Sequence, residues 1–271
     1  MLLAVLDDCQ PTALEERDGT LTVFFSDSQH RDSAREAIMR AWPAAVVSSR
    51  EVDDEDWARR SQESLGPVTV GRITVAPPWV PPAPFAPLSL VIEPSMAFGT
   101  GHHATTRLCL VALQMLNLAG TYMLDVGTGS GILAIAARML GADGALGIDN
   151  DPDAVQCARE NLSLNPGVTN VRFRLGDLLT GGSGPSALHV ARGLQLGAPD
   201  VVVANLTGEL LRRSSALLAA AFAPGGALIV SGLVAEEREE VAAAFSDLDL
   251  VWEAEEEGWA GLGFARLGPS T

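Results

Sequence analysis

One stretch of the sequence decides the fold of this chain: Tyr122-Met123-Leu124-Asp125-Val126-Gly127-Thr128-Gly129-Ser130-Gly131-Ile132-Leu133. Its first five residues form an apolar run that Asp125 alone interrupts, and three glycines follow at every second position. The apolar residues after the glycines are typical of a helix start. A strand that leads through a glycine turn into a helix opens a doubly wound α/β fold. Glycine permits the turn because it has no Cβ, and it lets a ligand approach the backbone N–H groups.

The spacing of the glycines favours an adenosyl ligand over a dinucleotide. A dinucleotide site uses G-x-G-x-x-G with an acidic residue ~20 positions later. Here the spacing is G-x-G-x-G, and Asp125 would bring negative charge toward a pyrophosphate. Asp125 suits S-adenosylmethionine better, because that molecule carries a cationic sulfonium and an ammonium. Asp149 ends the next apolar run, where it is placed to accept hydrogen bonds from ribose hydroxyls. A glycine turn without a ligand is the alternative.

Composition excludes several other kinds of chemistry. The 271 residues have 47% hydrophobic content and a net charge of −16, and all 18 basic residues are arginine. Without lysine, the chain supports neither Schiff-base or pyridoxal-phosphate chemistry nor a Walker-type phosphate loop. The acidic charge disfavours nucleic acid as a partner and would attract a basic protein substrate, although solubility accounts for the charge equally well.

The remaining compositional signals indicate a cytoplasmic protein. No apolar run is long enough to cross a membrane, and Met1–Asp8 lacks the basic region of a signal peptide. Cys9, Cys109 and Cys157 show no C-x-x-C spacing, which is typical of reduced thiols. The adjacent His102-His103 pair has no ligand spacing, so we expect no metal site. We expect a monomer that does not contact membranes.

The sequence pattern divides the chain into three parts. Residues 1–50 alternate strand-like runs, Ala44–Val47 among them, with an amphipathic helix from Arg31 to Trp42, which predicts a small α+β domain. Residues 51–93 combine a charged helix with a proline-dense segment and are predicted to connect the domains. From 94 to 271 strands and helices alternate, which predicts a mostly parallel sheet with ligands at the C-terminal ends of its strands. Residues 180–199 interrupt this alternation and are predicted to be a surface insertion.

Two motifs flank the glycine turn. Asn205 ends the fourth predicted parallel strand, where it can either bind a substrate amine or cap the next helix. Methyltransferases that act on the amino groups of bases or glutamine carry a stacking aromatic residue just after this position, whereas here Leu206-Thr207 follows, which favours an aliphatic amine. Phe98-Gly99-Thr100-Gly101 precedes a helix start at Thr105-Thr106, whose N–H and hydroxyl groups are placed to hold the carboxylate of the cofactor.

Taken together, these motifs resemble one family. The blocks Met96–Thr106, Leu124–Ala134 and Val203–Leu206, with Asp54–Trp57, are similar to those of the bacterial methyltransferases that modify the eleventh protein of the large ribosomal subunit. The resemblance implies a Rossmann-like, seven-stranded class I methyltransferase sheet and an N-terminal recognition domain, here a truncated ferredoxin-like unit. The predicted cofactor-binding residues are Thr106, Gly127, Gly129, Asp149 and Asn205, of which Gly129 is placed by its position in the turn and the other four by the resemblance.

The resemblance also implies a reaction. Methyl groups would pass from S-adenosylmethionine to lysine side chains and the N-terminal amine of that ribosomal protein. Asn205 is the predicted catalytic residue, because it can orient the amine, and positioning would provide most of the rate. Two alternatives remain open: a class I methyltransferase that acts on a small molecule or ribosomal RNA, and a non-catalytic protein that binds an adenosyl nucleoside.

Overall fold

The computed structural model describes residues 13–17, 20–25, 27–42, 45–49, 66–81, 87–94, 99–177 and 198–266. It divides the chain into two compact units, 1–59 and 60–271. The predicted charged helix over 51–65 lies outside the described residues, as does most of the predicted insertion over 180–199.

In its described part, the first unit is a small α+β arrangement, as predicted. Strands β1 (Ala13–Arg17) and β2 (Thr20–Phe24) pair antiparallel and precede α2 (Ser28–Ala41). The helix begins three residues before the predicted Arg31 because Asp27 caps it, accepting the N–H of His30 at 2.9 Å. The predicted strand over 44–47 is wrong in its described part, since residues 45–49 belong to no strand.

A three-stranded sheet opens the second unit, in the region where sequence predicted a connecting segment. Its strands are β3 (Val68–Val70), β4 (Ile73–Ala76) and β5 (Leu88–Val91), with β3–β4 antiparallel and β4–β5 parallel. One core cluster buries four of its apolar side chains, Val70, Ile73, Val75 and Leu90, and also Ile92, which follows β5. The same cluster contains residues of helices α4 (Ala104–Met115) and α5 (Ile132–Met139). The described part of the predicted connector, 66–81 and 87–93, therefore lies within the second unit, because its apolar residues supply core contacts.

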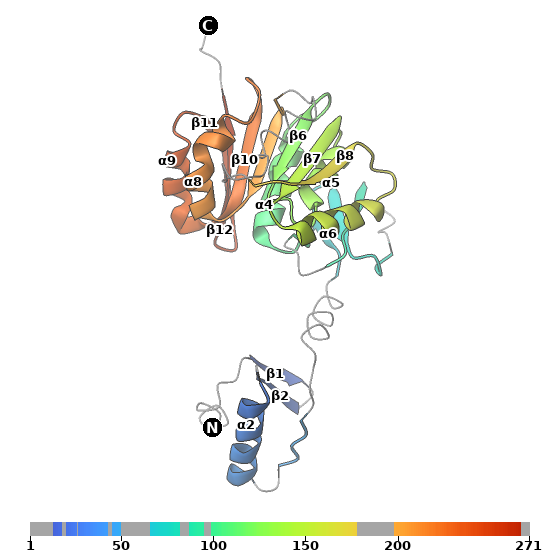
Figure 1. Cartoon of the computed structure of the whole chain (residues 1–271), viewed down its shortest axis with the longest axis vertical. Coiled ribbons are helices and arrows are strands. Elements are labelled where there is room, and N and C mark those ends of the chain that lie inside the picture. Colours follow the sequence, from blue (N-terminus) through green and yellow to red (C-terminus); the bar gives the residue numbers. More distant parts are fainter. Residues whose placement is uncertain are drawn as a thin grey trace. The chain divides into compact units, whose positions relative to one another are not determined.

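The second unit is built on a seven-stranded sheet with the order β11-β12-β10-β9-β6-β7-β8 (Figure 1). The first five strands along the chain run parallel, and β12 pairs antiparallel with both β10 and β11. This confirms the predicted doubly wound sheet. The strands are β6 (Tyr122–Val126), β7 (Gly144–Asp149), β8 (Val171–Leu175), β9 (Val201–Asn205), β10 (Ala227–Val234), β11 (Asp249–Glu256) and β12 (Trp259–Ala265).

Helices cover both faces of this sheet (Figure 1). Alternate residues of each strand point to opposite faces, so Met123 packs with α4, α5 and α6 while Leu124 packs with α8 and α9. The helices are α4 (Ala104–Met115), α5 (Ile132–Met139), α6 (Pro152–Ser163), α8 (Gly208–Ala219), the 3-10 turn η2 (Ala235–Glu237) and α9 (Arg238–Ala244). Both faces are thus apolar, which explains why the parallel strands read as near-continuous hydrophobic runs.

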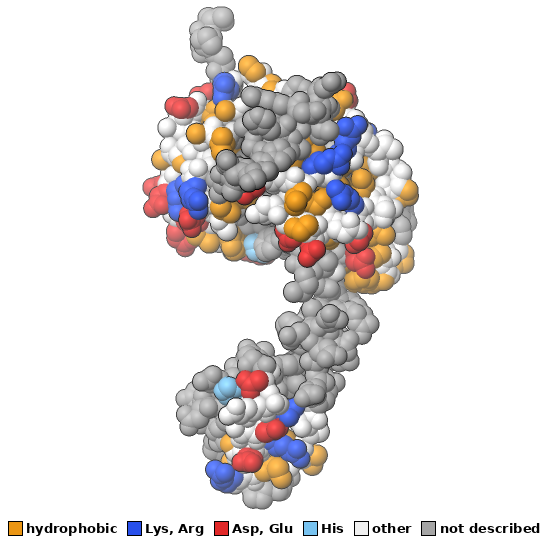
Figure 2. All heavy atoms as spheres, in the orientation of Figure 1, with side chains coloured by type: hydrophobic (Ala, Val, Ile, Leu, Met, Phe, Trp, Pro, Cys, Tyr) orange, Lys and Arg blue, Asp and Glu red, His pale blue; other side chains and the backbone are white. Residues whose placement is uncertain are grey.

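The surface of the second unit carries interspersed charges. Figure 2 shows arginine and acidic side chains gathered over α8 and α9, where Arg212 lies 3.3 Å from Glu237 and 3.5 Å from Glu240. Within the described ranges, no helix has the length and apolar character needed to cross a membrane.

The packing of β4 yields a first prediction. Ile73→Ala should lower the free energy of unfolding by about 2–5 kcal/mol, because Ile73 is 0% exposed and its truncation leaves a cavity beneath α4. Arg72→Ala, at the exposed neighbouring turn position, should change it by less than about 0.5 kcal/mol. Urea unfolding of the two variants provides the measurement. Equal stability of both variants would mean that the 68–92 region contributes little to the fold.

Candidate functional site

The predicted glycine turn and Asp149 meet at the C-terminal edge of β6 and β7. The side chain of Asp149 accepts the N–H of Gly129 at 2.9 Å through Oδ2 and the N–H of Asp151 at 3.1 Å through Oδ1. Gly129 has φ of +51° and Gly127 has φ of +71°, a conformation that L side chains rarely adopt. The carboxylate of Asp149 therefore closes the turn onto the next strand.

The backbone N–H groups of the turn donate hydrogen bonds to other groups of the protein. The N–H groups of Gly127 and Thr128 both donate to the carbonyl of Ile148, at 2.9 and 3.0 Å, and the N–H of Gly131 donates to Thr128 at 2.8 Å. With Gly129 bonded to Asp149, four N–H groups of the turn are occupied. The expectation that a ligand binds these donors is therefore wrong for those four, and what the glycines offer is backbone without Cβ atoms.

The second glycine-rich motif lies against the first. The hydroxyl of Ser130 donates to the carbonyl of Gly99 at 2.6 Å. A Cβ on Gly99, which has φ of +103°, would lie 2.8 Å from the Ser130 hydroxyl oxygen, and a Cβ on Gly101 would lie 3.1 Å from Val75. Both positions therefore require glycine, because a Cβ at either one would lie too close to a neighbouring side chain. Sequence reasoning named both motifs but missed Ser130 as their link.

Thr106 lies in the first turn of α4. Its side chain is buried, and its hydroxyl oxygen has no hydrogen-bond partner within the described part of the chain. His103 caps the same helix, and its ring packs edge-on against Trp259 with centroids 4.8 Å apart. A buried hydroxyl without a partner is costly, so Thr106 is a position where a ligand group would restore a bond.

Asn205 ends β9 beside the glycine turn. Val126 pairs with Ala204, so the residues that follow them, Gly127 and Asn205, are neighbours across the sheet. The N-terminal cap of α8 is Thr207 rather than Asn205, and no side-chain cap bond is made there. The helix-cap alternative is therefore excluded. Leu206 lies over the turn, because a Cβ on Gly127 would come within 2.5 Å of its side chain.

Asp125 differs from its predicted role. It is 0% exposed and accepts the hydroxyl of Thr128 at 2.6 Å, so it does not face a cationic ligand. Burial raises the pKa of the Asp125 carboxyl to about 7, and the nearby Asp149 charge acts in the same direction. Hydrogen bonds from Thr128 and the Ala134 N–H oppose the rise. Asp125 is thus a structural carboxyl beneath α5, which the strand pattern alone did not indicate.

His102 and His103 both contact polar groups of the protein itself. His102 bonds the carbonyl of Gly66 through Nε2 at 2.8 Å, while Nδ1 of His103 lies 2.8 Å from the hydroxyl of Thr105. Among the described residues, no group of three or more histidine, cysteine, aspartate or glutamate side chains is arranged to hold a metal ion.

Comparison with known proteins gives consistent matches. The sequence profile described as "Ribosomal protein L11 methyltransferase (PrmA)" matches residues 5–266. The ribosomal protein L11 methyltransferase of Deinococcus radiodurans is 40% identical over 236 residues, covering 86% of this chain and 79% of that protein. The protein of the same name from Cupriavidus pinatubonensis is 39% identical over 260 residues, covering 93% of this chain and 81% of that protein. A crystal structure of the ribosomal protein L11 methylase from Lactobacillus delbrueckii subsp. bulgaricus has a TM-score of 0.64 at 26% identity, covering 74% of this chain and 99% of that one.

The buried carboxyl of Asp125 predicts a pH-dependent stability. Its pKa is raised from 3.8 to about 7 on folding, so the unfolded state ionises first and stability falls as pH rises through this window. Between pH 5 and 8, wild type should lose about 3 kcal/mol of unfolding free energy relative to Asp125→Asn. Denaturant unfolding at each pH provides the measurement, with the exposed Asp143→Asn as the charge-matched control. Parallel pH profiles for wild type and Asp125→Asn would contradict the assignment.

Proposed function

The chain belongs to the ribosomal protein L11 methyltransferase family, and on this basis we propose that it transfers methyl groups from S-adenosylmethionine to amino groups of ribosomal protein L11. The amino groups are lysine side chains and the N-terminal amine. One observation supports the proposal beyond membership: Gly127, Asp149 and Asn205 all lie at the C-terminal edge of the parallel strands. This edge is where open α/β sheets bind their ligands.

The residues at this edge fit an adenosyl cofactor. Gly129 has no Cβ, so a ligand can approach its backbone closely, whereas the space beside Gly127 is filled by the Leu206 side chain. The carboxylate of Asp149 keeps lone pairs beyond its two N–H bonds, and these would accept ribose hydroxyls. The Thr106 hydroxyl, buried and without a partner in the described residues, would bind the carboxylate of the cofactor.

The chain's own task is to present the amine. When bound, S-adenosylmethionine supplies a methyl group on a cationic sulfonium. A free lysine has a pKa of about 10.4, so holding it neutral near pH 7.4 costs about 4 kcal/mol. Asn205, half-buried at the end of β9, would accept a hydrogen bond from the amine through its amide oxygen. The rate then comes mainly from alignment of the amine rather than from a general base.

Two features favour a protein amine over the alternative substrates. The net charge of −16 repels phosphate backbones, which disfavours ribosomal RNA. Leu206 follows Asn205 where a stacking aromatic would serve a planar base. A small-molecule substrate would leave the separate first unit without a role.

We propose that the protein acts in the cytoplasm as a monomer.

Methyl transfer to the purified substrate tests the proposal. Wild type incubated with S-adenosylmethionine and ribosomal protein L11 should add methyl groups to lysine side chains and the N-terminal amine, counted by mass spectrometry. Asn205→Ala should lower kcat at least about tenfold while changing the cofactor Kd less than about threefold, because the lost bond matters mainly when the amine is aligned.

Two controls sharpen this test. Asn117→Ala, an exposed asparagine beyond the end of α4, should keep wild-type kcat. Wild-type turnover by Asn205→Ala would remove Asn205 from the reaction. Absence of any methylation of the ribosomal protein, with cofactor binding intact, would instead favour a different substrate or a non-catalytic role.

The first unit is proposed to recognise the protein substrate. Every residue assigned to the cofactor or to the amine lies in the second unit, between Thr106 and Asn205. The first unit has a small core of Ala34 with Val23, Phe25 and Ile38, and it exposes apolar side chains of Met39 and Val46. A separate module that docks the substrate would let several amines reach one pocket.

Removing the first unit tests this division of labour. A fragment of residues 60–271 should bind S-adenosylmethionine within about twofold of the full chain, yet methylate the ribosomal protein with a kcat/KM at least about tenfold lower. Calorimetry and a methyl-transfer assay provide the two measurements. If the first unit serves only to cover apolar surface, the fragment will aggregate and lose cofactor binding as well. Normal methylation by a soluble fragment would refute both interpretations.

A further inference from the structure

Two buried asparagines, Asn161 in α6 and Asn165 just beyond its C-terminal end, bond the backbone of β5 and of the residues after it. The side-chain amide of Asn165 makes two hydrogen bonds with the backbone of Val91 in β5. It accepts the Val91 N–H at 2.9 Å and donates to the Val91 carbonyl at 2.7 Å. Asn161, one helical turn earlier, accepts the N–H of Glu93 at 2.9 Å. Both amides therefore bond backbone groups along the outer edge of the three-stranded sheet, where β5 is the edge strand among the described residues.

Asn161 also reaches the glycine turn, which Asn165 does not. Its side-chain N–H group donates to the carbonyl of Ser130 at 2.9 Å. The Ser130 hydroxyl in turn donates to Gly99 at 2.6 Å. The side chain of Asn161, 1% exposed, thus joins α6 to the turn after β6 and to the backbone of Glu93.

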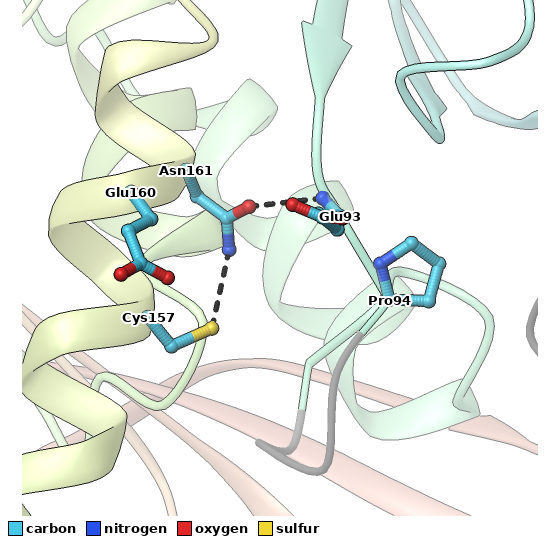
Figure 3. A pocket seen from close by; sticks show the side chains of 5 residues that line it. All are labelled: Glu93, Pro94, Cys157, Glu160 and Asn161. Carbon is cyan, nitrogen blue, oxygen red and sulfur yellow. Dashed lines mark hydrogen bonds between the residues drawn. The ribbon is translucent and has the colours of Figure 1, made fainter. Parts of the chain in front are cut away.

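The bonds of Asn161 span a gap between two elements. Figure 3 shows the side chain extending from α6 toward the backbone of Glu93, beside a cavity of about 270 Å³ that Glu93 and Pro94 line from one side and Cys157 and Glu160 from the other. The Asn161 amide bridges α6 and the backbone of Glu93 beside this cavity. The same amide fixes the carbonyl of Ser130.

We propose that Asn161 is a positioning residue for the cofactor site. It holds the two glycine-rich turns, at Gly127–Gly131 and Gly99–Gly101, at the separation that an adenosyl cofactor requires. The inference rests on the proposed function, because it concerns the same cofactor. Asn161 itself binds the protein backbone, so its effect on the ligand is transmitted through Ser130 and Gly99.

The matched pair Asn161→Ala and Asn165→Ala tests the proposal in the full-length chain. Both variants lose bonds to the same edge of the sheet, so both should lower the melting temperature. Only Asn161→Ala should weaken S-adenosylmethionine binding, by about tenfold in Kd by calorimetry, whereas Asn165→Ala should stay within about twofold. In methyl transfer, Asn161→Ala should raise KM for S-adenosylmethionine by a similar factor and leave kcat within about threefold.

A second variant keeps the test decisive if Asn161→Ala does not fold. Asn161→Asp has the same shape and still accepts the Glu93 N–H, but it cannot donate to Ser130 unless protonated, so it should also weaken binding at pH 8. Wild-type affinity in a folded Asn161 variant, equal weakening by Asn165→Ala, or failure of both Asn161 variants to fold would overturn the proposal. If wild type itself binds no S-adenosylmethionine, the proposed function fails and this inference with it. Tight binding by both wild type and Asn161→Ala would refute the inference alone.

Discussion

The hydrogen bond from the Gly129 N–H to the Asp149 carboxylate is the interaction on which the site depends. It ties the turn after β6 to the end of β7, and the bonds from Gly127 and Thr128 to Ile148 reinforce the same connection. The turn can make these bonds only because its glycines take left-handed backbone conformations. Helix α5 starts from this turn, so the direction of the helix and the shape of the site are set by the same few bonds.

This arrangement determines which ligand the turn can accept. A pyrophosphate is held by free backbone N–H groups at a helix start. Here four N–H groups of the turn are bonded within the protein, and the one acidic side chain preceding the glycines, Asp125, is buried under α5. What remains at this strand edge are the carboxylate of Asp149 and the amide of Asn205, which suit a ligand that offers hydroxyl and amine groups. The preference for an adenosyl ligand over a dinucleotide therefore stands. The reason is that the N–H groups of the turn are occupied, and not that Asp125 is charged.

The site is also assembled from more of the chain than the central sheet. The three-stranded sheet of β3–β5 packs its apolar face under α4 and α5, and Val75 contacts the second glycine motif at Gly101. Ser130 and Asn161 then connect that motif, the turn and α6 by two hydrogen bonds, of 2.6 and 2.9 Å. A further bond, of 2.9 Å, joins Asn161 to the N–H of Glu93. Buried polar groups that are fully bonded in this way specify one arrangement of the surrounding backbone. The candidate site is thus shaped by the segment before the sheet as well as by the sheet itself.

The sequence by itself determined the alternation of strands and helices, the doubly wound sheet, the glycine turn and the family, because these depend on local periodicity and on motifs of contiguous residues. Even several boundaries, such as β8 at Val171–Leu175, follow from local pattern. Only the tertiary structure decided the burial of Asp125, the placement of residues 68–92 in the core and the roles of Ser130 and Asn161. These features arise from contacts between distant residues, 31 positions apart for Ser130 and Gly99 and 68 for Asn161 and Glu93. The local sequence around a serine or asparagine does not indicate such a distant partner, since the same sequence could equally form an exposed helix.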